Sequence, residues 1–128
     1  MELVTKKVGE VVVVGLTEPS VLDSSNVEDF RKKMTDMVEH GTRLVVDMTN
    51  ITIFDSSGLH AFVAIGRHVS SMDGQVKLCR MDALFRNVFQ LMGIHRVLQT
   101  YDTEEEALAS YEPGVEGRNR GRIIAATT

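Results

Sequence analysis

Two adjacent hydroxyl groups follow an acidic residue in the segment Asp55-Ser56-Ser57-Gly58-Leu59, between an apolar run and an amphipathic helix. Side chains of these types can cap a helix, accept a phosphoryl group or act as nucleophiles. At 100° per residue, the helix gathers its apolar residues on one side, namely Leu59, Phe62, Val63, Gly66 and Val69. Ser57 points almost directly away from this stripe and Ser56 lies on its flank. We therefore expect Ser57 to be the more exposed hydroxyl.

The surrounding residues argue against catalysis by these serines. The esterase pattern Gly-x-Ser-x-Gly requires a glycine where Asp55 stands. The only histidine close in sequence is His60, which at three residues after Ser57 lies over the next helical turn and is expected to face solvent. A glycine-rich phosphate loop is also missing from the sequence. The chain is therefore predicted to have no catalytic residue and not to be a kinase itself.

The Asp55-Ser56-Ser57-Gly58-Leu59 segment resembles the signature of the anti-sigma factor antagonists of the STAS domain family, and the similarity covers roughly residues 3 to 112. The resemblance implies that the unphosphorylated chain binds an anti-sigma factor with serine-kinase activity and thereby frees a sigma factor. It implies phosphorylation at Ser57, with Ser56 as second choice, and a serine phosphatase that resets the switch. It also implies a partner-binding surface made of Asp23, Ser24, Ser25, Asp55, Ser56, Ser57, Gly58 and Leu59.

The segment before the first helix departs from the family pattern. The family usually carries a Gly-Glu-Leu-Asp type sequence there, of which this chain keeps Leu22-Asp23 but lacks the glycine. The preceding Glu18-Pro19-Ser20 stretch is longer than usual, so we expect a partner-facing loop of altered shape. By resemblance Asp23 lies near Ser57 and contacts the partner; a carboxylate that only favours the nearby helix dipole is the alternative.

Strands and helices alternate along most of the chain. Apolar runs predict strands at residues 3–8, 11–16, 43–48, 76–80 and 96–100, with a further extended segment at 51–54. Helical spacing and capping-box matches at Ser25 and Thr103 predict helices at residues 25–40, from 57 to about 72, from Asp82 to Gly93, and from 103 to Pro113. This order predicts a single α/β domain with a mixed sheet. The resemblance implies that it is a STAS-like domain, with about four helices packed on a sheet of four to five strands.

Length and charge predict one domain at residues 1–112 and a basic, flexible tail at 113–128. The chain has 128 residues, of which 43% are hydrophobic, which suffices for one core. The formal charge is -4; since the tail holds three arginines and one glutamate, the tail is +2 and the body -6. An acidic body argues against direct nucleic-acid binding.

Other composition features predict a soluble protein without bound groups. The four histidines and the single cysteine, Cys79, show no metal-ligand spacing, and Cys79 lies in a predicted strand where a buried thiol is expected. No apolar stretch approaches the ~20 residues of a membrane span, and no signal peptide is evident. We expect a cytoplasmic protein that needs no cofactor or metal and inserts into no membrane.

Two other roles remain open for a STAS-like chain. It could be a non-phosphorylated scaffold or sensor subunit of a stress-signalling complex. It could also be a soluble accessory subunit of a membrane transport system. The sequence leaves the oligomeric state open, a homodimer included.

Overall fold

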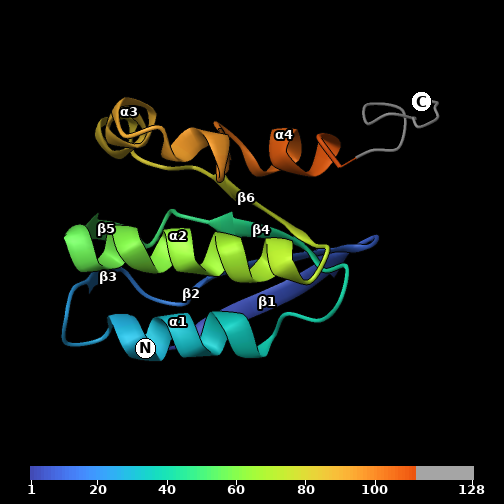
Figure 1. Cartoon of the computed structure of the whole chain (residues 1–128), viewed down its shortest axis with the longest axis horizontal. Helices are drawn as coiled ribbons and strands as arrows, with labels where there is room; N and C mark the ends of the chain where they lie inside the picture. The colour runs from blue at the N-terminus through green and yellow to red at the C-terminus, as the bar shows by residue number, and fades with distance from the viewer. Residues whose placement is uncertain (112–128) are drawn as a thin grey trace.

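The computed structural model describes residues 1–111, in which a five-stranded sheet of order β1-β2-β4-β6-β7 forms the centre (Figure 1). Its strands are β1 (Leu3–Val8), β2 (Val11–Leu16), β4 (Arg43–Asp47), β6 (Gln75–Cys79) and β7 (Gln99–Tyr101). β1 and β2 are antiparallel, whereas β2, β4, β6 and β7 are mutually parallel. The predicted mixed sheet is confirmed.

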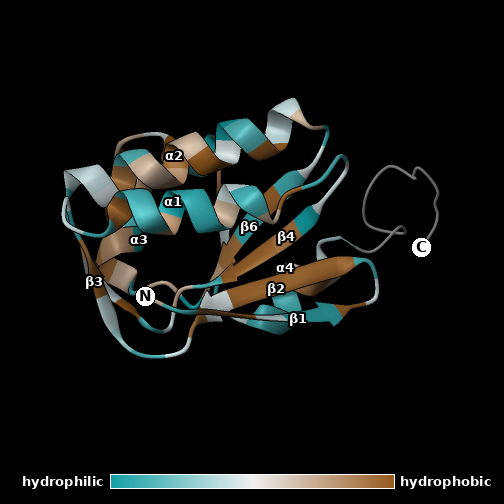
Figure 2. Ribbon diagram, turned by 90° about the horizontal axis from the view of Figure 1, so that it is seen from below, coloured by the Kyte–Doolittle hydropathy of each residue, from teal (hydrophilic) through white to brown (hydrophobic). Residues whose placement is uncertain are grey.

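Valine-rich strands occupy the middle of the sheet because both of its faces are covered. β-branched residues favour such strands, and Figure 2 shows β2 and the middle of β4 as hydrophobic. Helices α1 (Val27–Asp36) and α2 (Ser56–Ser71) cover one face, and the short α4 (Glu104–Ala109) covers the other. α3 (Ala83–Leu91) and the 3₁₀ turn η1 (Ile94–Arg96) connect β6 to β7.

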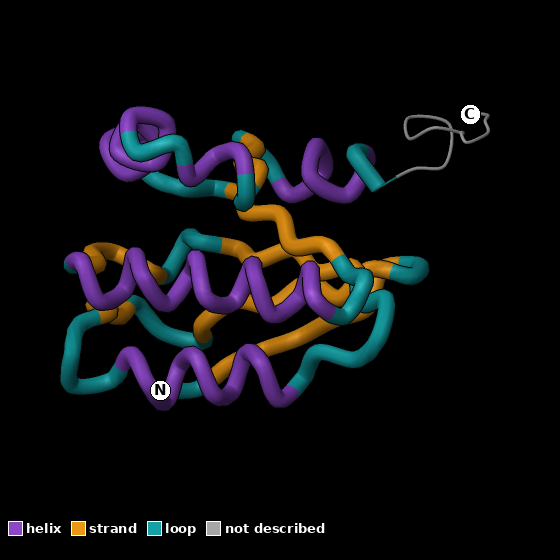
Figure 3. Tube along the Cα trace, in the orientation of Figure 1, coloured by secondary structure: helices purple, strands orange, loops and turns teal. Residues whose placement is uncertain are grey.

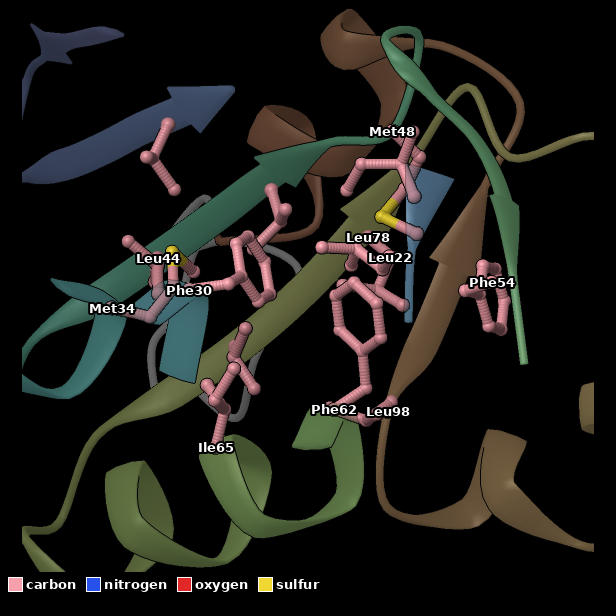
Figure 4. Packing of buried hydrophobic residues seen from close by; sticks show 14 of the residues in the cluster. Leu22, Phe30, Met34, Leu44, Met48, Phe54, Phe62, Ile65, Leu78 and Leu98 are labelled. Atoms are coloured by element: carbon pink, nitrogen blue, oxygen red, sulfur yellow. The ribbon is translucent and has the colours of Figure 1, made fainter. Parts of the chain in front are cut away.

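The larger core lies between α1, α2 and the sheet. Phe30 of α1 and Phe62 of α2 meet edge to face, with ring centroids 5.4 Å apart. Figure 4 shows Phe62 and Ile65 pointing from α2 toward the strands. On the opposite face, Tyr111 donates from its hydroxyl to the carbonyl of Leu44 at 2.9 Å. Both faces of the sheet are thus held by buried contacts.

A second, two-stranded sheet lies at the N-terminal end of α2 (Figure 3), and the sequence did not predict it. It pairs β3 (Ser20–Leu22) in parallel with β5 (Ile51–Phe54). The strand β3 therefore begins within the Glu18-Pro19-Ser20 stretch, at Ser20, where a long loop was expected. The Ser20 amide, next to the proline that cannot donate, reaches the carbonyl of Asn50 at 2.8 Å.

Several predicted boundaries were wrong. The first helix was predicted at residues 25–40 but spans Val27–Asp36, and the last strand was predicted at 96–100, where the chain instead forms η1 before β7. The capping box at Ser25 does not form, because the Ser25 hydroxyl donates to Asp23 and Asn26 takes the N-cap position. The Thr103 cap is confirmed, since its hydroxyl accepts from the Glu106 amide.

Two of the remaining helices follow the prediction closely. The long helix begins one residue before Ser57, and Asp82 caps α3 as expected. The predicted domain boundary at residue 112 lies outside the described residues. The predicted tail, residues 113–128, lies outside them as well.

Candidate functional site

The site begins where the two strands of the small sheet end. β3 and β5 run parallel with Leu22 beside Phe54, so the residues that follow them lie at the same edge. The Asp55 amide extends this ladder by donating to the Leu22 carbonyl at 3.2 Å. Asp23 and Asp55 are thereby brought to neighbouring positions.

The two loops that follow have the same Asp-Ser-Ser sequence and the same hydrogen bonds. In the loop of Asp55, one carboxylate oxygen accepts from the Ser57 amide at 2.9 Å and from the Ser57 hydroxyl at 2.6 Å. In the loop of Asp23, the corresponding oxygen accepts from the Ser25 amide at 2.9 Å and from the Ser25 hydroxyl at 2.5 Å. In each loop the aspartate therefore fixes the position of the second serine through two hydrogen bonds.

The middle serine of each loop, Ser24 or Ser56, is exposed. Within residues 1–111, neither of these two hydroxyls forms a hydrogen bond, whereas those of Ser25 and Ser57 donate to an aspartate. The two loops therefore each present one hydroxyl that is available to a partner. The repeated Asp-Ser-Ser sequence is visible in the chain, but the sequence analysis did not predict that the two copies would form matching loops.

The expectation that Ser57 is the more exposed serine is wrong, because Ser57 is half-buried and Ser56 is exposed. The expected apolar stripe was centred too far around the helix. The buried face of α2 also includes Gly58, Ala61 and Ile65, whereas Val63 is only half-buried. At 100° per residue these residues rotate the buried direction by roughly half a residue step toward Ser57 and away from Ser56.

Gly58 lets the helix begin close to the small sheet. A Cβ atom at this position would lie 2.7 Å from the Phe54 Cβ and 3.4 Å from the Leu22 Cβ. The start of α2 therefore packs directly on both strands. Gly58 and Leu59 are buried, so these two predicted partner-binding residues support the loop from inside.

Hydrogen bonding favours the ionised form of both aspartates. The Ser57 hydroxyl, followed by the Gly58 amide, lowers the pKa of Asp55 below its ordinary value. The Ser25 hydroxyl and amide lower the pKa of Asp23 in the same way, while the charge of Asp55 acts weakly in the opposite direction. The site therefore presents two negative charges beside the exposed serines at neutral pH.

Asn26 is a site residue that the sequence analysis missed. Its side-chain nitrogen donates to the Val21 carbonyl at 2.8 Å, and its side-chain oxygen accepts from the Asp23 amide at 3.1 Å. Asn26 thus ties the first loop to β3 and fixes the direction of Asp23. The preference of asparagine for the N-cap position could have identified it.

The part of the chain that the structure describes offers little for other chemistry. Among residues 1–111, no three histidine, cysteine or acidic side chains gather where they could hold a metal ion. None of the described helices is long and apolar enough to cross a membrane. Cys79 is buried as predicted, and this burial raises the pKa of its thiol to about 12, which keeps it protonated.

The profile of the STAS domain matches residues 2–107. The chain belongs to the STAS domain family. By sequence it is 24% identical to BtrV of Bordetella bronchiseptica, which is named as an anti-sigma factor antagonist, over 88% of this chain and 96% of that protein.

Solved structures extend the comparison. A Thermotoga maritima protein, also named as an anti-sigma factor antagonist, is 25% identical, with a TM-score of 0.71 over 84% of this chain and 92% of that one. The antagonist SpoIIAA shares the fold at 24% identity in its unphosphorylated form, with a TM-score of 0.61 over 94% of this chain and all (100%) of that one. Its phosphorylated form from Bacillus gives a TM-score of 0.60 at 24% identity, over 84% of this chain and 97% of that one. The expected resemblance to anti-sigma factor antagonists is confirmed.

Proposed function

We propose that this STAS protein is an anti-sigma factor antagonist that acts in the cytoplasm. Its unphosphorylated form binds an anti-sigma factor with serine-kinase activity and so releases a sigma factor. Phosphorylation in the Asp55-Ser56-Ser57 segment ends that binding, and a serine phosphatase restores it. The observation that carries this proposal is the exposed hydroxyl of Ser56 at the start of α2, in a chain similar over most of its length to BtrV.

Ser56 fits the phosphorylated position better than Ser57. A phosphoryl group on Ser57 would replace the proton that now bonds to Asp55, and would place two anions where the present oxygen–oxygen distance is 2.6 Å. The same group on Ser56 leaves the Asp55 cap intact and lies near the positive end of the α2 dipole. Ser57 then serves as a positioning residue, and Ser56 carries the switch.

The described residues supply an acceptor and a docking surface, while the nucleotide and its magnesium ion belong to the kinase. Asp23 and Asp55 flank the acceptor with negative charge, so a partner that fits the unmodified loop must complement two carboxylates. A phosphate adds about -1.5 to -2 charges to that surface. The partner would then meet like-charge repulsion and the desolvation of a dianion.

Phosphate mapping tests this proposal. The whole chain is incubated with ATP, magnesium and the anti-sigma factor kinase encoded beside its gene, and the modified residue is located by mass spectrometry. Ser56→Ala is expected to abolish incorporation, whereas Ser57→Ala retains it. Ser24→Ala is the matched control, because Ser24 has the same place in the sister loop.

Each result of this experiment has a defined meaning. Phosphate on Ser57 alone would move the acceptor to the residue favoured by the sequence resemblance. Phosphate on neither serine would reject the switch. Copurification with a transport ATPase, without any kinase, would instead support the transport-subunit alternative.

A further inference from the structure

α3 carries an apolar surface in addition to the one that it buries. Phe89 is fully buried, and the Phe85 ring lies 4.3 Å from that of Phe54, centroid to centroid. The adjoining side of the helix nevertheless leaves Leu84, Leu91 and Met92 exposed, at 68%, 87% and 58% of their surface. With the half-buried Val88, these residues form what we name the α3 stripe: Leu84, Val88, Leu91 and Met92.

The spacing of the α3 stripe places its members on one side of the helix. Positions 84, 88 and 91 are separated by four and three residues, which brings them together on a helical surface. Arg86 is the only charged residue between Ala83 and Met92, and it is paired with Asp102. An uncharged, contiguous apolar surface of this kind marks an interaction site in a soluble domain.

The α3 stripe belongs to the same end of the molecule as the Asp-Ser-Ser loops. Figure 1 shows α3 at the end of the molecule where α2 begins, and its Phe85 and Phe89 rings contact Phe54 of β5. Phe54 links α3 to the second loop. It directly precedes Asp55 in the chain, and its ring packs against that of Phe85. A partner that covers Ser56 therefore has α3 within its reach.

A stable interface needs more surface than either the loops or the α3 stripe supplies alone. A specific interface takes roughly 20–30 residues from each partner. The two loops provide only residues 23–25 and 55–57, which are polar, and the α3 stripe alone is too small to hold two copies of this chain together. Combined, the stripe forms an apolar centre and the loops a charged rim, which is the usual anatomy of a protein interface.

We propose that the α3 stripe is the apolar part of the surface that docks the anti-sigma factor kinase. This inference rests on the proposed function and adds the chemistry of the contact: the kinase presents an uncharged apolar patch to α3 and donor groups to Asp23 and Asp55. Because the stripe holds no phosphorylated residue, its contribution to affinity is the same before and after modification of Ser56.

A double variant tests the α3 stripe. Leu84→Gln with Leu91→Gln keeps two exposed side chains similar in size but makes them polar, so the fold is unaffected. Its affinity for the same kinase, measured by calorimetry, is expected to fall at least tenfold. Val8→Gln is the matched control, since Val8 is an exposed valine of β1 at the opposite end of the sheet, and its affinity stays within twofold.

The outcomes separate this inference from the proposed function. Equal affinity of the double variant and the wild type, with Ser56 still phosphorylated, would overturn the role of α3 and leave the switch intact. Failure of the wild-type chain to bind the kinase would overturn both. A wild-type dimer that the double variant converts to a monomer, with kinase binding unchanged, would assign the stripe to self-association and so reject the proposal.

Discussion

Asp55 shows how one carboxylate oxygen can organise a site. It accepts hydrogen bonds from the Ser57 hydroxyl, the Ser57 amide and the Gly58 amide, at 2.6, 2.9 and 3.2 Å. These bonds cap α2 and fix the Ser57 side chain against Asp55. Ser56 is left as the exposed hydroxyl. The aspartate of the motif is therefore as important to the geometry as the serines.

The lowered pKa of Asp55 makes stability depend on pH in a defined direction. Since its pKa is lower in the folded state than the ordinary value of 3.8, the unfolded chain binds the proton more readily. The contribution of Asp55 is complete above that ordinary value and is lost as the pH falls through the lowered pKa. Urea unfolding followed from about pH 6 to 2 should therefore show a shallower acid loss for Asp55→Asn than for the wild type. Identical slopes would contradict this assignment.

At the level of single residues, the sequence predicted the segment but not the free hydroxyl. A helical projection treats the first turn as part of a regular pattern, whereas the exposure of Ser56 and Ser57 depends on how α2 lies on the strands. Ile65 and Ala61 are buried there and Val63 is only half-buried, and a projection along one helix contains no information about the neighbouring elements.

The position of the site depends on the close contact of the start of α2 with strands β3 and β5. Gly58→Ala should destabilise the fold by about 1–3 kcal/mol, because the added carbon would lie 2.7 Å from the Phe54 Cβ. Gly15→Ala is the control, since its Cβ would meet the nearest atom at an ordinary 3.5 Å and should change stability by about 0.5 kcal/mol or less. Urea unfolding measures both values, and equal losses would refute the packing argument.

Apart from α1, whose ends were predicted too far out, the missed and shifted elements are short. β3 has three residues, directly after a proline, and so gives no periodic signal. Its existence depends on pairing with β5, whose partner residues lie 31 or 32 positions later in the sequence. β7 is equally short and its start was displaced because η1 precedes it. The long α2 and the central strands were predicted closely, since their hydrophobic patterns extend over enough residues to determine type and position.

The whole molecule is an acidic body with its candidate interface at one end of the sheet. The fold class was predictable because alternating strands and helices leave few ways to cover both faces of a sheet. The position of the interface was only partly predictable. The motif identified the two loops, but the exposure of Leu91 depends on how α3 packs, which the sequence pattern does not reveal.

The net charge gives the switch a dependence on salt. Residues 1–112 carry a formal charge of -6, and Ser56→Asp adds a further negative charge at the interface. This variant should bind the kinase about thirtyfold more weakly than the wild type. Screening by salt should narrow the difference, so calorimetry at roughly 0.05 M and 0.5 M salt tests the electrostatic origin. A difference that does not change with salt would indicate a steric cause instead.

The parallel pairing of β3 with β5 joins the two Asp-Ser-Ser loops into one structural unit. The Asp55 amide donates a hydrogen bond to the Leu22 carbonyl, so a displacement of one loop would also displace the other. Exchanging one loop for that of a related protein would produce a mismatched pair. Recognition could be transplanted between such proteins only by moving residues 20–25 and 51–58 together, which makes this pair of segments the natural module for redesigning partner choice.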